Sequence, residues 1–182
     1  MARSICIPSS DVPAAGVPNH VSSREHHAAA PRAGAAALRR ERHDVIKDII
    51  KDEEFLAKPA EPATVEDAEV AQDLLDTMAA NEDCAGLAAN QIGSTKAIIA
   101  FQGANGPQVM YNPKVIASMA PYTATEGCLS LDRDTQVRRF QLVRVKFDAL
   151  VNGKFESRTR KYSGWVAEVV QHGIDHCAGK LV

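Results

Sequence analysis

Residues 142–153 read LVRVKFDALVNG, and this stretch decides the fold class. Apolar side chains occupy every second position along most of it: Val143, Val145, Phe147 and Ala149. A period of two is typical of a β-strand with one buried face. The Asn152-Gly153 pair that follows is a strong signal for a type I′ hairpin turn. We therefore predict an antiparallel hairpin whose return strand runs from Lys154 to about Tyr162.

Outward from the hairpin, the C-terminal side changes from a period of two to helical spacing. A helix is predicted from Ser163 or Gly164 to a stop at Gly179. Its packing face contains Val166, Val169, Val170 and Ile174. On the N-terminal side, residues 97–101 and 109–111 are predicted as short strands, the second ended by Asn112-Pro113.

Two helical patterns precede the strands. Residues 45–55 have apolar spacing of helical type, and Pro59 and Pro62 break it. A second helix is predicted from an N-cap at Thr64 to about Asn81. Its buried face should contain Val65, Ala68, Ala71, Leu75 and Met78. The fold class is α+β, with antiparallel β-sheets packed around a C-terminal helix.

Bulk properties limit the function classes. The chain has 182 residues and a formal net charge of −2, so charge points neither to nucleic acid nor to a membrane surface. No apolar run approaches the roughly 20 residues that span a bilayer. The four cysteines show no Cys-x-x-Cys spacing, which favours a reducing, cytoplasmic compartment.

Residues 1–41 differ in composition from residues 42–182. They are rich in Ala, Arg and Pro and lack apolar periodicity, so we interpret them as a poorly ordered extension before one folded domain. A plain tail, an upstream start and an organelle transit peptide remain alternatives. His20, His26 and His27 lie in this extension, and belong either to the tail or to a metal-binding cluster.

The C-terminal helix contains a histidine pair. Residues 171–176 read QHGIDH, and side chains four residues apart project from one helical face, so His172 and His176 can hold one metal ion. In the His-Glu-x-x-His pattern, the residue after the first histidine is the general base. Here that residue is Gly173, which has no side chain.

Two further segments contain groups of chemical interest. Residues 86–93 read GLAANQIG, a loop in which small residues permit a close backbone approach and Gln91 offers an amide donor. Residues 126–130 read EGCLS, where Cys128 is a candidate thiolate ligand for Zn²⁺ or Fe²⁺. Each segment alone fits an ordinary loop or a buried cysteine equally well.

In this order, the three segments resemble the signature motifs of peptide deformylases: G-x-G-x-A-A-x-Q, E-G-C-L-S and Q-H-E-x-D-H. The resemblance spans about residues 43–182. It implies that Cys128, His172 and His176 hold one divalent metal ion, Fe²⁺ in most of the family, with Zn²⁺ or Ni²⁺ also accepted. It implies that Gln91 and the backbone N–H of Leu129 stabilise the oxyanion, and that Gly86 lines the substrate groove.

The resemblance also implies the substrate and the partners. The family removes the formyl group from N-terminal formylmethionine of nascent peptides, near the ribosome, and we expect a monomer with no nucleic acid or membrane contact of its own. Two departures are small: Cys84 replaces a motif glycine, and Thr135 stands where similar chains often have arginine.

Gly173 is the large departure. Loss of a positioned acid or base typically costs about 10²–10⁴ in rate. Asp175 should face away from the metal, Glu168 is interpreted as a solvated or supporting acid, and Glu126 as a group that fixes its loop. Two hypotheses follow: a deformylase with impaired activity, or an inactive protein of this fold that binds metal and formylated N-termini.

Overall fold

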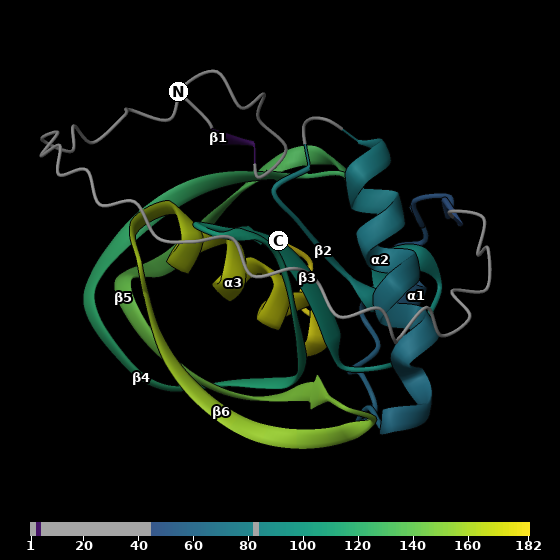
Figure 1. Cartoon of the computed structure of the whole chain (residues 1–182). Coiled ribbons are helices and arrows are strands. Elements are labelled where there is room, and N and C mark those ends of the chain that lie inside the picture. Colours follow the sequence, from purple (N-terminus) through teal and green to yellow (C-terminus); the bar gives the residue numbers. More distant parts are fainter. Residues whose placement is uncertain (1–2, 5–44, 82–83) are drawn as a thin grey trace, which may run out of the picture.

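The sheet curves around the last helix. The computed structural model describes residues 3–4, 45–81 and 84–182. Five strands follow in chain order, each antiparallel to the next: β2 (Gly86–Ala88), β3 (Ile98–Gly103), β4 (Gly106–Cys128), β5 (Leu131–Val151) and β6 (Lys154–Ser163). Helix α3 (Gly164–Cys177) lies inside the curve, and α2 (Ala68–Ala80) lies against the side formed by β2 and β3 (Figure 1). The predicted α+β class is confirmed.

The predicted hairpin is confirmed, and the alternating apolar side chains of its first strand face the core. Val143 and Val145 are fully buried against α3, together with Val169 and Val170 of that helix. The turn is at Asn152 and Gly153, both with positive φ, as a type I′ turn requires.

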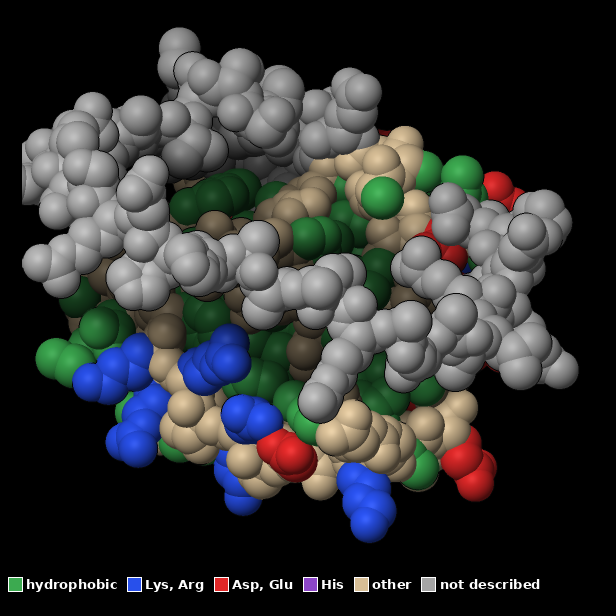
Figure 2. Space-filling view, in the orientation of Figure 1, with side chains coloured by type: hydrophobic (Ala, Val, Ile, Leu, Met, Phe, Trp, Pro, Cys, Tyr) green, Lys and Arg blue, Asp and Glu red, His purple; other side chains and the backbone are tan. Residues whose placement is uncertain are grey.

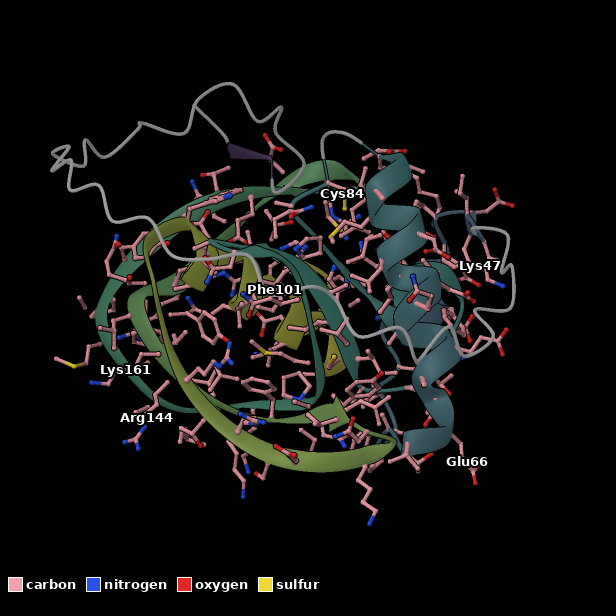
Figure 3. The ribbon with its side chains drawn as sticks, viewed as in Figure 1. Lys47, Glu66, Cys84, Phe101, Arg144 and Lys161 are labelled. Carbon is pink, nitrogen blue, oxygen red and sulfur yellow. The ribbon has the colours of Figure 1, made fainter. Side chains whose placement is uncertain are left out.

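The outer face of the same hairpin is basic. Arg144 and Lys161 are register partners on β5 and β6, and their side chains point outward from the convex face of the curved sheet (Figure 3). Lys and Arg side chains gather along this side of the molecule (Figure 2).

Strand β4 does not end at Asn112-Pro113, and this prediction is wrong. Asn112 adopts a φ of 52°, and the register with β5 shifts between Tyr111 and Lys114, so the Asn-Pro pair is absorbed in a bulge. The Asn112 side chain secures the bulge, because it accepts from Ala63 N at 2.7 Å and donates to Ala63 O at 3.0 Å. The strand continues to Cys128 and therefore carries a candidate ligand.

The helix predicted over residues 45–55 is also wrong. Only α1 (Glu53–Leu56) is helical, capped by Asp52. The backbone before it is held by tertiary bonds, since Lys47 N donates to Thr77 Oγ1 at 3.0 Å and Ile50 N to Gln91 O at 2.9 Å. Bonds to other elements replaced the i to i−4 bonds that the apolar spacing suggested.

The helix predicted from Thr64 is confirmed with a different start and face. A 3₁₀ turn (Val65–Asp67) precedes α2, and Thr64 and Asp67 form a capping box. Val65 is 41% exposed, and Leu74 rather than Leu75 is the fully buried leucine. At the other end of the chain, α3 ends before Gly179 as predicted, with Gly179 at a φ of 70°.

Part of the predicted N-terminal extension forms a strand. Residues Arg3–Ser4 make β1, which pairs in parallel with Glu126 and Gly127 of β4. The rest of residues 1–41, with His20, His26 and His27, lies outside the described residues. Among the described residues, no helix is long and apolar enough to cross a membrane.

Candidate metal centre

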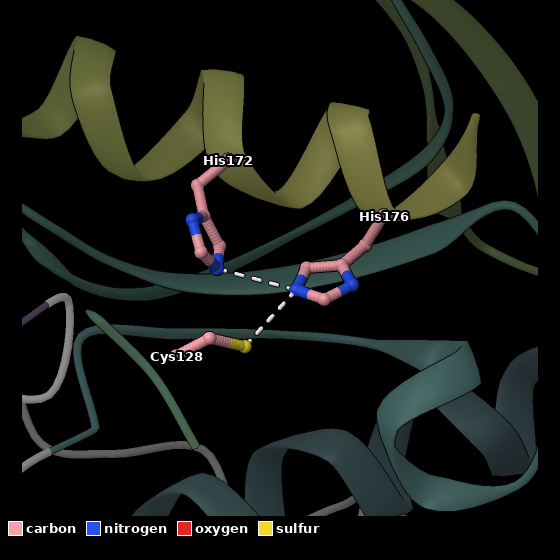
Figure 4. A group of neighbouring side chains, drawn as sticks. All are labelled: Cys128, His172 and His176. Carbon is pink, nitrogen blue, oxygen red and sulfur yellow. Dashed lines mark hydrogen bonds between the residues drawn. The ribbon is translucent and has the colours of Figure 1, made fainter. Parts of the chain in front are cut away.

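Three potential metal-donor atoms, one from β4 and two from α3, lie close together between these two elements. Cys128 ends β4, and His172 and His176 lie one turn apart on α3 (Figure 4). Cys128 Sγ is 3.3 Å from His176 Nε2, which is 3.2 Å from His172 Nε2. All three donors lie within 4.8 Å of one another, and both histidines are buried. A soft thiolate with two imidazoles is a donor set suited to Zn²⁺ or Fe²⁺.

A carboxylate fixes the orientation of His172. Glu126 Oε2 is 2.9 Å from His172 Nδ1, and because a carboxylate only accepts, Nδ1 is the protonated nitrogen. The lone pair of His172 is therefore on Nε2, which faces the other two donors. A hydrogen bond of this kind is what metal-ligating histidines usually make with their second nitrogen.

Arg139 holds Glu126 in turn. Its Nε and Nη2 donate to the two oxygens of Glu126 at 2.6 and 2.8 Å, and its Nη1 to Asp175 Oδ2 at 2.5 Å. Burial alone would raise the pKa of Glu126, but the hydrogen bonds from His172 and Arg139 hold that pKa below its ordinary value. Glu126 is thus an anion that positions His172, within a strand and not in a loop as predicted.

His176 is suited to act as a neutral donor. Burial, with the nearby His172 and Arg139, lowers the pKa of His176 to about 3. Its Nδ1 is buried and has no hydrogen-bond partner among the described residues. A neutral imidazole that directs Nε2 at a sulfur and a second imidazole fits a metal site better than a hydrogen-bonded pair.

Gln91 points into the same cluster. Its Nε2 is 3.4 Å from Cys128 Sγ and 3.2 Å from Ser130 Oγ, and its Oε1 accepts from Ala88 N at 3.0 Å. Leu129 follows Cys128 in the tight turn between β4 and β5, where Cys128 pairs with Leu131. Both predicted oxyanion donors therefore lie beside the predicted ligands.

Gly86 lines a small cavity beside His172 and Gly173. A Cβ on Gly86 would lie 2.7 Å from Val169 Cγ1, so only glycine allows β2 to approach α3 this closely. Cys84, at the replaced motif glycine, donates to Gly86 O at 3.4 Å.

Gly173 lies directly against Ile99 of β3. A Cβ there would lie 3.1 Å from Ile99 Cγ2 and 3.3 Å from Ile99 Cβ, tighter than ordinary packing. The other acids on α3 are engaged elsewhere. Asp175 binds Arg139 and Lys180, and Glu168 accepts from the Tyr122 hydroxyl.

Two sequence interpretations change here, those of Glu168 and Arg139. Glu168 is 7% exposed, so it is a buried acid and not a solvated one. Asp175 has the structural role that was expected. Arg139 was not predicted, because the uncertain alignment between Leu131 and Phe140 gave no reason to choose it over neighbouring arginines. The signal that could have identified it is that the two motif acids, Glu126 and Asp175, require a buried cation between them.

Fold and site together are typical of metal-dependent hydrolases, in which three protein ligands leave one position open. Comparisons give the family. The profile described as "Polypeptide deformylase" matches residues 46–182. The peptide deformylase of Clostridium beijerinckii is 37% identical over 139 residues, which cover 76% of this chain and 100% of that protein. The chain belongs to the peptide deformylase family, and a deformylase-like hydrolase function is supported.

Solved structures agree. A peptide deformylase from Legionella pneumophila matches with a TM-score of 0.67 and 30% identity, over 75% of this chain and 83% of that one. A class I type b enzyme from Acinetobacter baumannii, whose structure is described as Met-Ala-Ser bound, matches with a TM-score of 0.65 and 26% identity, over 75% and 97%.

Proposed function

We propose that this protein is a deformylase-like metallohydrolase acting on N-terminal formylmethionine of nascent peptides, with turnover limited by Gly173. The observation that carries the proposal is the convergence of Cys128 Sγ, His172 Nε2 and His176 Nε2 within 4.8 Å. We also propose that it works as a monomer in the cytoplasm, close to ribosomes, where such peptides emerge.

The three converging residues would hold one divalent metal ion, Fe²⁺ first, with Zn²⁺ or Ni²⁺ as alternatives. When bound, such an ion polarises the scissile carbonyl and makes water more acidic. The Gln91 amide and the Leu129 backbone N–H stabilise negative charge on the formyl oxygen. Since Gln91 Nε2 already donates to Cys128 and Ser130, it must exchange one of these bonds to reach the substrate.

Gly173 supports the proposed limit on turnover. The family position carries a glutamate that moves the proton to the leaving amine, and Gly173 cannot replace it. Asp175 and Glu168 do not substitute, because their carboxylates are bonded to Arg139 and Tyr122 respectively. The expected deficit is about 10²–10⁴ in rate.

Metal content tests the site without activity. Purified protein loaded with Fe²⁺, Zn²⁺ or Ni²⁺ should hold close to one ion per chain by elemental analysis. Cys128→Ala should lower this stoichiometry strongly, whereas Cys177→Ala is the matched control and should retain it. Wild-type protein that takes up none of the three ions would refute the metal site.

Restoring the acid tests the role of Gly173. Gly173→Glu should raise kcat on a formyl-Met peptide by about 10²–10⁴. Because the new Cβ approaches Ile99 Cγ2 most closely, the double variant with Ile99→Ala, which removes Cγ2, should gain at least as much. Equal, fast rates in wild type and variant would show that another group transfers the proton.

The second candidate is a catalytically inactive protein of this fold that binds metal and formylated N-termini. Gly173 is the observation that favours it. It predicts metal and peptide binding without formyl release in wild type and in Gly173→Glu alike.

A further inference from the structure

The convex face of the sheet contains a cluster of basic side chains from three strands. Lys114 of β4 is the register partner of Lys146 of β5. Arg144 of β5 is the register partner of Lys161 of β6. Residues directly opposite each other in a sheet project from one side, as do residues two apart on a strand. The four side chains therefore share one side, where all are exposed, and we call them the basic face (Figure 3).

The basic face brings like charges together. Neighbouring strands lie about 4.8 Å apart and residues two apart on a strand about 7 Å, so the four cations form a row with intervals of roughly 5–7 Å. Among the described residues, none of the four has an acid within ion-pair distance. The next acid along β5, Asp148, accepts a hydrogen bond from Asn112. Like charges directly opposite each other destabilise a sheet, so this arrangement costs stability unless an anion binds.

The formal net charge of −2 conceals this cluster, because charge is unevenly distributed along the chain. Residues 45–81, which contain α1 and α2, have ten Asp and Glu but three Lys and Arg. Residues 142–163, which contain the β5–β6 turn, have two Asp and Glu but six Lys and Arg. Glu66 beside α2 lies on the opposite side of the molecule from Arg144 and Lys161 (Figure 3). Net charge, the basis for expecting no nucleic acid contact, averages over these two regions.

The regular spacing of the row indicates the kind of partner. Cations at near-equal intervals match a polymer that has one negative charge per unit, and a nucleic acid strand has one phosphate per nucleotide. An anionic membrane fits less well, because interfacial binding scales with buried apolar area as well as with charge. Strand β4 exposes two large apolar side chains, Ile116 and Met119, which is a small area for insertion.

We propose that the basic face binds the phosphate backbone of RNA. The choice of RNA over DNA rests on the proposed function, because RNA is the polyanion present where peptides are made. Each of the four cations contacts a phosphate, and the Arg144 guanidinium can also stack on a base. The metal centre lies between β4 and α3, and α3 is inside the curve of the sheet, so RNA on the convex face leaves it open (Figure 1).

Salt dependence of RNA binding measures the number of contacts in the full-length protein. The probe is a fluorescein-labelled oligo(U) RNA of about 20 nucleotides, longer than the roughly 4–16 nucleotides that single-strand sites cover. Four phosphate contacts predict a slope of about −2.8 for the logarithm of the association constant against the logarithm of salt concentration. Fluorescence anisotropy should therefore show affinity falling about 50-fold between about 50 and 200 mM salt.

Two double variants separate the basic face from net charge. Arg144→Gln with Lys161→Gln should reduce the slope to about −1.4 and weaken binding at least about tenfold at about 50 mM salt. Its Tm at low salt should not fall below that of wild type, because a like-charge pair is removed. Lys51→Gln with Lys58→Gln removes the same charge from exposed residues that flank α1, and this matched control should keep the affinity within about twofold.

The outcomes are decisive for the basic face. The proposal is wrong if wild type does not bind oligo(U) at about 50 mM salt, or if both double variants weaken binding equally. It is also wrong if oligo(dT) binds more tightly than oligo(U), or if poly-glutamate or phosphatidylglycerol vesicles bind as tightly.

Formyl release distinguishes this proposal from the proposed function. Both double variants should release formate from formyl-Met-Ala-Ser at the wild-type rate, because none of the substituted residues contacts a metal donor. Release without RNA binding would overturn the RNA contact alone. RNA binding through the basic face, in a protein that takes up no metal and releases no formate, would refute the metallohydrolase alone.

Discussion

Replacing Arg139 with methionine should cost a large part of the stability of this domain. Arg139 is 3% exposed and is the cation for both Glu126 and Asp175. Methionine fills much of the arginine volume but leaves Glu126, which is 0% exposed, with His172 as its main partner. Removing one partner of a buried ion pair typically costs about 3–5 kcal/mol.

For a chain of this size, each kcal/mol corresponds to about 2–4 °C in Tm. We therefore expect Arg139→Met to lower Tm by about 6–20 °C, measured by circular dichroism at pH 7, with a matching fall in the urea midpoint. Arg133→Ala is the control, because Arg133 forms an exposed pair with Glu53 and its loss should leave Tm almost unchanged.

The same variant should weaken metal binding, since the loss of groups that orient a ligand typically costs 10–100-fold in affinity. Arg139→Met with Tm within 3 °C of wild type and full metal affinity would refute the reasoning. It would mean that Glu126 is satisfied by His172 alone.

Three further predictions concern the same helix and its neighbours. Gly173→Ala should destabilise by about 1 kcal/mol despite better helix propensity, because overpacking against Ile99 exceeds the gain. A higher Tm than wild type would contradict this. In an Ile99→Ala background, where the contacting Cγ2 is gone, Gly173→Ala should no longer destabilise. Cys177, whose pKa burial raises to about 12, should resist iodoacetamide at pH 8 in folded protein and react after denaturation, as read by peptide mass mapping. Because the folded protein lowers the pKa of Glu126, ionised Glu126 stabilises the fold fully above its ordinary pKa of 4.5, and this stabilisation is lost as the pH falls through the folded pKa. Arg139→Met should therefore lose less unfolding free energy on acidification than wild type. Equal slopes of unfolding free energy against pH would count against this prediction.

Local patterns predicted the elements whose stability is local. The alternation around Val145 and the turn at Asn152 needed only neighbouring residues, and both are present as predicted. The interpretation failed where distant partners decide the backbone. Residues 45–52 are not helical, because they form hydrogen bonds to α2 and to Gln91. Strand β4 continues past the Asn-Pro pair, because the side chain of Asn112 bonds to the backbone of Ala63.

The candidate site divides in the same way. Its three donors and Gln91 came from short motifs whose spacing is visible in the sequence. Arg139 and the buried state of Glu168 did not, because both depend on which residues of β4, β5 and α3 face one another. A single sequence gives no means of choosing among Arg133, Arg138 and Arg139.

The arrangement around Gly173 is consistent with our proposal that the candidate metal site persists without its acid. His172 is oriented by Glu126 and Arg139 from β4 and β5, and none of these bonds involves residue 173. The opposite wall at residue 173 is Ile99, an apolar side chain that fills space without bonding to the donors. Loss of a glutamate at this position therefore removes a proton carrier without removing a support of the ligands. Residue 173 variants should therefore change turnover without changing metal affinity, whereas Arg139 variants should weaken metal binding and turnover together.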